Sequence, residues 1–249
     1  MTARAARAGP SRRPNRGPFP RASLLWGLVG VAAQVAFTGG WVVAETWQGP
    51  AYSPLSSTIS DLQAANAPHV WFPVLCFAVG GLGTFAFAAF GLRPALAAAG
   101  RTAAYAPWVL AIAGLAIGNS FPLIPCQTAH PGCSASAQLN SPGGITDAVV
   151  STLAFLALAL LPFPLWRRLR LLSEWRRVKP VMVAARILGP AGFVLLYVAS
   201  VTELAEGLME RALAVICGLW IAALAATLIG NALPSRRGGA DPRSLQAGL

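Results

Sequence analysis

Six long apolar segments, separated by polar gaps, constrain this chain more than any other feature of its sequence. A run of about 20 apolar residues is long enough to cross the ~30 Å hydrocarbon core of a bilayer as one helix. The runs predict helices at about residues 24–45, 70–92, 104–123, 147–166, 182–203 and 212–233. The expected fold class is therefore all-α: a polytopic integral membrane protein built as a bundle of six transmembrane helices.

The arginines indicate how these helices are oriented. All 19 basic residues except Arg186 and Arg211 lie in the N-terminal tail, the second gap, the fourth gap or the C-terminal tail. Because loops rich in Arg and Lys stay in the cytoplasm, both termini are predicted to be cytoplasmic. Residues 1–22 and 234–249 are rich in Arg, Pro and Gly and are expected to be disordered tails. A single six-helix transmembrane domain, residues 23–233, lies between them.

The net charge of +11 does not indicate a nucleic-acid partner. Only 11% of the residues are charged, whereas a soluble domain usually carries about 25%. The basic residues flank apolar runs instead of gathering on one folded face, so their distribution reflects membrane orientation. Only Lys179 among the 19 is a lysine, a bias associated with GC-rich bacterial genomes. We expect a multi-pass protein of the bacterial plasma membrane, with the lipid bilayer as its main partner.

The first outer gap, residues 46–69, is long for a helix connection, and long loops are often functional. Ser60 and Gln63 have the spacing of a capping box, which predicts a short helix beginning at Ser60. Trp47 and Tyr52 are aromatic residues of the kind that anchor a loop at headgroup depth. Two interpretations remain open: a lid over a pocket between helices, or an interfacial helix packed on the bundle.

The second outer gap, residues 123–146, contains Cys126 and Cys133. In an oxidising compartment these residues can form a disulfide, which would contribute roughly 2–3 kcal/mol in the chain-entropy model. The alternative is a metal site that includes His130, but the spacing of the two cysteines matches no common zinc pattern. The disulfide is favoured, and no metal or cofactor is expected.

Most of the acidic residues lie at the outer boundary of the predicted helices, namely Glu45, Asp61, Asp147, Glu203, Glu206 and Glu210. This distribution fits either a polar outer site or ordinary solvation of helix ends. Asp147, or Thr146 beside it, is placed to cap the fourth helix. Glu203, Glu206 and Glu210 share one face if the fifth helix continues outward. Arg211, the one basic residue outside, is expected to pair with an acid from another loop.

Polar residues inside the predicted spans are expected to face the interior of the bundle. Asn119 lies near the outer end of the third helix, and Gly114 and Gly118 form a small surface for close helix approach. Arg186 lies about one turn inside the fifth helix, from where it can reach the cytoplasmic headgroups. No string of mid-membrane acids is present, which weighs against an ion-coupled pump.

Several segments resemble one known family. They are Pro50-Ala51-Tyr52-Ser53 followed by Ile59-Ser60-Asp61-Leu62, Phe121-Pro122, the Cys126…Pro131-Gly132-Cys133 loop, and Glu210-Arg211. These are similar to the domain of unknown function 998 family, and the likeness covers roughly residues 24–233. The resemblance implies a six-helix prokaryotic membrane protein. Where many members carry an Asp after Phe-Pro and a His-Gly before the fourth helix, this chain has Cys126-Gln127 and Gly143-Gly144.

The favoured interpretation is a non-enzymatic protein that binds or passes a lipid or small hydrophobe at an outward-facing site. Such a site would be formed by the two outer loops, where aromatic and polar side chains gather. The candidate binding residues are Trp47, Tyr52, Ser60, Asp61 and Asn119.

The alternative is a membrane-embedded hydrolase or metal-dependent enzyme. Its candidate catalytic residues are Asp61, His69, His130, Asp147 and Glu203. Neither an H-E-x-x-H nor a G-x-S-x-G arrangement supports it. A secondary transporter is the third interpretation, although no inverted repeat is visible in the sequence.

Overall fold

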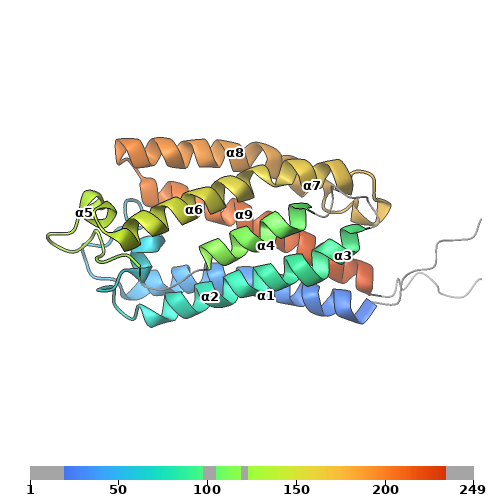
Figure 1. Cartoon of the computed structure of the whole chain (residues 1–249), viewed down its shortest axis with the longest axis horizontal. Coiled ribbons are helices and arrows are strands. Elements are labelled where there is room, and N and C mark those ends of the chain that lie inside the picture. Colours follow the sequence, from blue (N-terminus) through green and yellow to red (C-terminus); the bar gives the residue numbers. More distant parts are fainter. Residues whose placement is uncertain (1–19, 98–104, 119–122, 234–249) are drawn as a thin grey trace, which may run out of the picture.

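The computed structural model describes residues 20–97, 105–118 and 123–233, and within these ranges it contains helices and no β-strand (Figure 1). The all-α class is therefore confirmed. The elements are α1 Pro20–Ala44, η1 Glu45–Trp47, η2 Ser60–Gln63, α2 Trp71–Ala86, the π-helical η3 Phe87–Leu92, α3 Arg93–Leu96, α4 Tyr105–Ile117, α5 Ala135–Leu139, α6 Pro142–Leu160, α7 Pro162–Leu169, η6 Ser173–Trp175, α8 Lys179–Thr202 and α9 Glu206–Ala232.

The bundle has two distinct ends (Figure 1). Residues 46–70 and 123–141 form the connections at one end, here called the long-loop end. Both ends of the described chain, Pro20 and Leu233, lie at the opposite end, here called the terminal end, together with the connection between α7 and α8.

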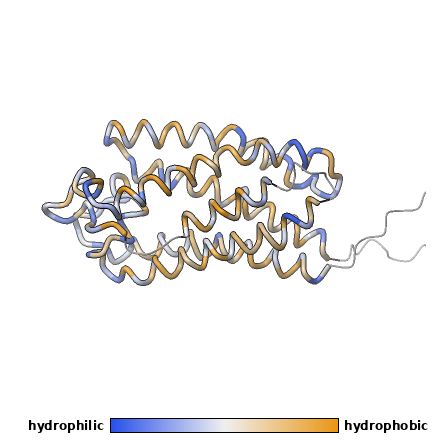
Figure 2. Tube along the Cα trace, in the orientation of Figure 1, coloured by the Kyte–Doolittle hydropathy of each residue, from blue (hydrophilic) through white to orange (hydrophobic). Residues whose placement is uncertain are grey.

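Five helical segments are long and apolar enough to cross a membrane: Arg21–Trp47, Trp71–Leu96, Pro142–Leu169, Lys179–Thr202 and Glu206–Ala232. Apolar residues run along them, and polar residues gather at the two ends (Figure 2). Large apolar side chains on α8 face outward, among them Ile187 at 66% and Val201 at 68% exposed, as expected of a lipid-facing helix. The chain thus has the helices expected of a membrane protein. The sixth span stays a prediction, because α4 has 13 residues and residues 119–122 lie outside the described ranges.

Small residues allow α2 and α4 to pack closely. A Cβ atom on Gly118 would lie 2.4 Å from the Cα atom of Gly81, and one on Gly114 would lie 2.7 Å from a methyl group of Thr84. The predicted close approach at Gly114 and Gly118 is therefore confirmed, and it occurs within the bundle.

The fourth predicted helix begins earlier than expected. α6 starts at Pro142, and the Ser141 hydroxyl accepts a hydrogen bond from the Gly144 N–H at 2.9 Å. Proline suits the first helical position because its missing N–H would have no partner there. The prediction that Asp147 caps this helix is wrong, since Asp147 lies in its second turn. Gly143 has no room for a side chain, because a Cβ atom there would lie 1.8 Å from the carbonyl oxygen of Leu123.

The connection between α8 and α9 also differs from the prediction. α8 ends at Thr202, and Glu203 and Ala205 both adopt φ of +56°, which reverses the chain. α9 then begins at Glu206, where a carboxylate favours the positive end of the helix dipole. The fifth helix therefore does not continue outward, so the condition under which Glu203, Glu206 and Glu210 would share one face is not met.

The short helix predicted at Ser60 is present as the four-residue 3₁₀ helix η2, but the capping box is not. The Thr58 hydroxyl, not that of Ser60, accepts a hydrogen bond from the first turn, at 3.2 Å from the Asp61 nitrogen. The Ser60 side chain therefore does not cap this helix.

Candidate functional site

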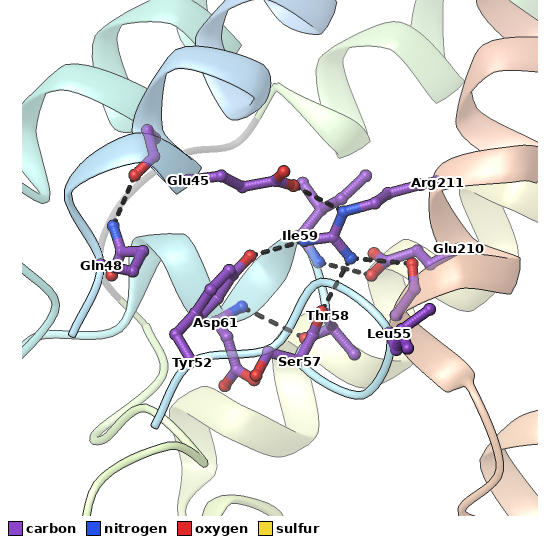
Figure 3. A network of polar contacts seen from close by, with 12 residues as sticks. Glu45, Gln48, Tyr52, Leu55, Ser57, Thr58, Ile59, Asp61, Glu210 and Arg211 are labelled. Carbon is purple, nitrogen blue, oxygen red and sulfur yellow. Dashed lines mark hydrogen bonds and ion pairs between the residues drawn. The ribbon is translucent and has the colours of Figure 1, made fainter. Parts of the chain in front are cut away.

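Arg211, in the second turn of α9, joins three segments of the long-loop end (Figure 3). Its Nε donates to Glu45 Oε1 at 2.6 Å, and its Nη2 donates to the Tyr52 hydroxyl at 2.5 Å. Its Nη1 donates to the carbonyl oxygens of Ser57, at 2.7 Å, and Gly207, at 2.8 Å. The predicted pairing of Arg211 with an outer acid is confirmed, and the acid is Glu45.

This Arg211 network (Arg211 with Glu45, Tyr52, Ser57 and Gly207) is a buried clamp. Arg211 is 7% exposed, so its charge needs a partner and hydrogen bonds to offset the loss of water. Burial raises the pKa of the Tyr52 phenol above its ordinary value. Tyr52 therefore stays neutral and accepts the guanidinium hydrogen bond. The network fixes the first long loop against the ends of α1 and α9.

Glu210, adjacent to Arg211 in sequence, does not pair with it. Its Oε2 accepts a hydrogen bond from the Ile59 N–H at 2.6 Å (Figure 3). Glu210 is also 7% exposed, and its side chain lines a pocket between the helices. These two adjacent residues thus serve different purposes: the Arg211 side chain is bonded within the loops, whereas the Glu210 carboxyl faces the interior of the bundle.

Asp61, which is 1% exposed, ties the first long loop to the second. Its carboxylate accepts hydrogen bonds from the Thr128 N–H at 3.1 Å and the Thr128 hydroxyl at 2.5 Å. A third comes from the Gln138 amide at 2.9 Å, and the same Gln138 nitrogen donates to the Cys126 carbonyl oxygen at 2.7 Å. A carboxylate with this many donors is fixed in place, which indicates a structural role for Asp61.

The segment that Asp61 holds also carries two cysteines. Cys126 and Cys133 form a disulfide with 6.1 Å between their Cα atoms, as the sequence predicts. Gln127, between them, donates from its backbone to Asn66 Oδ1 at 2.8 Å and from its side chain to Gln48 Oε1 at 2.9 Å. The two long loops therefore form one bonded cap over the end of the bundle.

Beneath this cap lies a cavity that we call the loop-end pocket. Its polar groups include two carboxyls, from Asp147 on α6 and Glu210 on α9, together with the side chains of Ser60 and Gln63. The Ser60 side chain bonds to the Asp147 carboxyl. Its complete lining is Phe37, Ile59, Ser60, Gln63, Phe77, Ala116, Ile117, Asp147, Ser151, Phe155 and Glu210, with no basic side chain among these described residues.

A second cavity, the mid-bundle pocket, adjoins the first and shares Phe37, Ile117 and Phe155 with it. Its walls are mostly apolar, with a polar patch where the Gln34 amide donates to the Thr84 hydroxyl at 2.9 Å. Each cavity has a volume of about 30 Å³, which is room for a few water molecules at most. Together they run from carboxyl groups at the long-loop end to an apolar interior.

The candidate catalytic residues do not converge on one centre. His69, His130 and Glu203 are exposed and lie outside both pockets. The Asp61 carboxylate already accepts hydrogen bonds from Thr128 and Gln138. Of the five candidates, Asp147 is the one that lines a described pocket. Within residues 20–97, 105–118 and 123–233, no group of three or more His, Cys, Asp or Glu side chains is placed to hold a metal ion. The enzyme interpretation therefore gains no support from the geometry.

The candidate binding residues are divided between the cap and the pocket. Ser60 lines the loop-end pocket, whereas Tyr52 and Asp61 belong to the cap. Trp47 also belongs to the cap, since its indole nitrogen donates to the Pro68 carbonyl oxygen at 3.2 Å. Asn119 lies outside the described residues.

Sequence reasoning did not select Glu210 as a site residue. The available signal was its position beside Arg211, the single outer basic residue, directly before the last apolar run. Phe37, Phe77 and Phe155 were also missed, because aromatic residues inside an apolar run look like any other core residue.

One comparison with known proteins gives a match: the family described as "Protein of unknown function (DUF998)" matches residues 20–227. No curated protein and no solved structure matches the chain. The matched range includes every residue of both pockets.

Proposed function

The chain belongs to the DUF998 family, whose description assigns no function, and we propose from its own geometry that it binds or passes a small amphipathic molecule through the two pockets. The observation that carries this proposal is the junction of the pockets at Phe37, Ile117 and Phe155. On one side of that junction the walls carry carboxyl, hydroxyl and amide groups, and on the other they are mostly apolar. A molecule with a polar head and an apolar body matches this change.

The polar head that fits the loop-end pocket is a hydrogen-bond donor, best an ammonium group. Asp147 and Glu210 both present carboxyl oxygens, and no described lining residue is basic. An anionic head would meet two carboxyl groups without compensation and is disfavoured. The rings of Phe37, Phe77 and Phe155 add a wall that suits either an apolar body or a cation.

The size of the cavities limits the ligand. Pockets for drug-sized ligands usually enclose about 300–1,000 Å³, which is far more than the space for a few waters found here. A short amphiphile requires the cap to yield locally, and a full diacyl lipid requires helices to separate. The proposed ligand is therefore a single-chain molecule, smaller than a membrane lipid.

The proposed orientation places the long-loop end outside a bacterial plasma membrane, with both termini in the cytoplasm and α4 as part of a sixth span. The distribution of arginines supports it, because the basic connection between α7 and α8 lies at the terminal end. The disulfide at the long-loop end is also consistent with an oxidising compartment. The pockets would then open toward the outside.

The test uses three probes with the same six-carbon chain: n-hexylammonium, n-hexanol and hexanoate. Each is titrated into the purified full-length chain in a neutral detergent, and binding is measured by calorimetry and by the shift in melting temperature. We expect hexylammonium to bind more tightly than hexanol, and hexanoate to bind weakest. Tighter binding of hexanoate, or no binding of any probe, would contradict the proposal.

Two variants and one matched control locate the binding. Glu210→Gln and Asp147→Asn each remove a carboxyl group from the pocket and should weaken hexylammonium binding about tenfold. Glu203→Gln removes an exposed carboxyl at the same end of the bundle and should leave binding unchanged. Equal losses in all three variants would indicate general attraction to the loops and would contradict a pocket site. Asp147→Asn is decisive if Glu210→Gln does not fold.

A further inference from the structure

Arg186 occupies an unusual position near the terminal end. It lies seven residues after the first residue of α8, about 10 Å along the helix, within a segment apolar enough to span a membrane. Its guanidinium carbon is 5.0 Å from the centre of the Phe163 ring and 5.7 Å from that of Trp166, both on α7. Its Nε atom is buried without a hydrogen-bond partner.

No acid compensates Arg186 within the described part of the chain, where the recorded ion pair joins Arg211 to Glu45. A charged residue at such depth is costly unless it finds a counter-charge or reaches the headgroup region. The two rings hold the side chain against α7, so it does not extend freely along α8 toward water. Stacking offsets part of the cost, but it leaves the N–H groups without an acceptor.

The surroundings of Arg186 favour an anion. The last turn of α7, the connection that follows it and the first residue of α8 carry one acid, Glu174, and six basic residues: Arg167, Arg168, Arg170, Arg176, Arg177 and Lys179. This charge excess at one membrane boundary attracts anionic headgroups. The adjoining surface is apolar, since Phe163 is 38%, Val183 41% and Ile187 66% exposed. Positive charge beside exposed apolar surface is the chemistry of an anionic lipid, with the phosphate at the arginine and the acyl chains along α8.

We propose that Arg186, held between Phe163 and Trp166, binds the phosphate of an anionic phospholipid at the terminal end of the bundle. A guanidinium presents a planar fork of N–H donors that matches two phosphate oxygens at once. The phosphate supplies the acceptors that Arg186 lacks within the described chain. This site lies at the opposite end of the bundle from the pockets and does not depend on the proposed function.

The experiment follows the fluorescence of Trp166, which contacts the site, in the purified full-length chain. Because the chain has 8 tryptophans, the Trp166→Phe variant identifies the component that responds. The chain in a neutral detergent is titrated with short-chain phosphatidylglycerol, with phosphatidylcholine of the same chain length, and with inorganic phosphate. We expect phosphatidylglycerol to bind at least about fivefold more tightly than phosphatidylcholine, because the surrounding residues are basic. Inorganic phosphate should bind weakly and should not compete at millimolar concentration.

Variants separate the site from general attraction to a basic surface. Arg186→Gln should weaken phosphatidylglycerol binding roughly tenfold or more, as expected for the loss of charge-assisted hydrogen bonds. The matched control is Arg93→Gln at the same end, because Arg93 also stacks on a tryptophan, 5.3 Å from the Trp108 ring centre, but is exposed. It should change binding by less than about twofold. Arg186→Lys keeps the charge without the planar fork and should give an intermediate affinity.

Three results would overturn the proposal. Unchanged phosphatidylglycerol affinity in Arg186→Gln would show that Arg186 does not bind the lipid. A loss of affinity in Arg93→Gln equal to that in Arg186→Gln would show that the lipid is attracted only by the general surface charge. Competition by inorganic phosphate as strong as by phosphatidylglycerol would indicate a site for a free anion instead of a lipid. If Arg186→Gln does not fold, Arg186→Lys is compared with the unmodified chain. Equal phosphatidylglycerol affinities of the two would show that only a point charge is needed and would contradict the proposed guanidinium site.

Discussion

Two arginines, one near each end of the bundle, differ in how their guanidinium groups are partnered within the protein. Arg211 and Arg186 both lie in candidate membrane-spanning helices, and both stack on aromatic rings, Arg211 at 5.8 Å from that of Trp41. Arg211 is also paired with Glu45 and bonded to Tyr52 and two carbonyl groups. Arg186, by contrast, stacks on the rings of Phe163 and Trp166 and has no acid beside it within the described residues.

The difference indicates that an arginine's partners within the protein decide which further contacts its guanidinium can make. A guanidinium whose donors are satisfied within the chain holds loops together and has little left for a ligand. One whose donors lack acceptors remains available to a partner from outside the chain. The long-loop end is therefore tightly cross-bonded, and the ligand site proposed there depends on the carboxyl groups that face the pocket, above all that of Glu210.

The largest expected effect comes from breaking the clamp. Arg211→Gln leaves Glu45 without its counter-charge and removes four hydrogen bonds, so it should lower the free energy of unfolding by about 3–5 kcal/mol. Thermal unfolding in detergent measures this loss. Arg186→Gln should cost much less in lipid-free detergent, because no described acid loses its partner. Equal destabilisation by the two variants would remove the contrast between the arginines.

The disulfide gives an intermediate effect confined to the long-loop end. Replacing Cys126 and Cys133 by serine should reduce stability by roughly 2–3 kcal/mol in the chain-entropy model. Cys76→Ser in α2, which alters a free cysteine, serves as the control.

The same cysteines test the orientation of the protein. In intact cells, a membrane-impermeant thiol reagent should label Cys126 and Cys133 only after reduction. Labelling without reduction would contradict the disulfide, and no labelling after reduction would place the long-loop end in the cytoplasm.

The smallest effect concerns Tyr52. Tyr52→Phe removes one hydrogen bond to Arg211 and should cost about 1–2 kcal/mol at neutral pH. Burial raises the folded-state pKa above the ordinary value of 10.0, so the neutral phenol contributes fully below pH 10. That contribution is lost as the pH rises toward the folded-state pKa, because the unfolded chain releases its proton first. Stability should therefore fall less between pH 10 and 11 in Tyr52→Phe than in the unmodified chain. The control is Tyr197→Phe on α8, where the tyrosine is 65% exposed; an equal change in this variant would contradict a special role for Tyr52.

The sequence predicted the parts of this molecule that depend on local pattern. Apolar runs located the long helices, the glycines at 114 and 118 located a close helix contact, and the spacing of Cys126 and Cys133 indicated their disulfide. Each of these signals is contained within a short stretch of chain, so no knowledge of the fold is required to read it.

The missed features depend either on helix starts that the apolar pattern does not mark or on partners far away in the sequence. Asp147 looked like a cap because it precedes the apolar run, but Ser141 and Pro142 begin the helix one turn earlier. α9 begins at Glu206, six residues before the predicted start at residue 212. Arg211 therefore lies inside the helix, where Glu45, far away in sequence, neutralises its charge. The sequence alone shows that Glu210 and Arg211 are charged-type residues directly before an apolar run. Only the fold shows that Glu210 lines a pocket whereas Arg211 holds the loops together.

The most direct test of the central claim is to locate a bound amphiphile. A hexylammonium probe carrying a photoreactive diazirine at the end of its chain is crosslinked to the purified protein, and the labelled peptides are mapped by mass spectrometry. Our account predicts labels on the segments around Phe37 and Phe155, competed by unlabelled hexylammonium and reduced in Glu210→Gln but not in Glu203→Gln. Labels confined to the exposed face of α8, insensitive to competition and to Glu210→Gln, would contradict it.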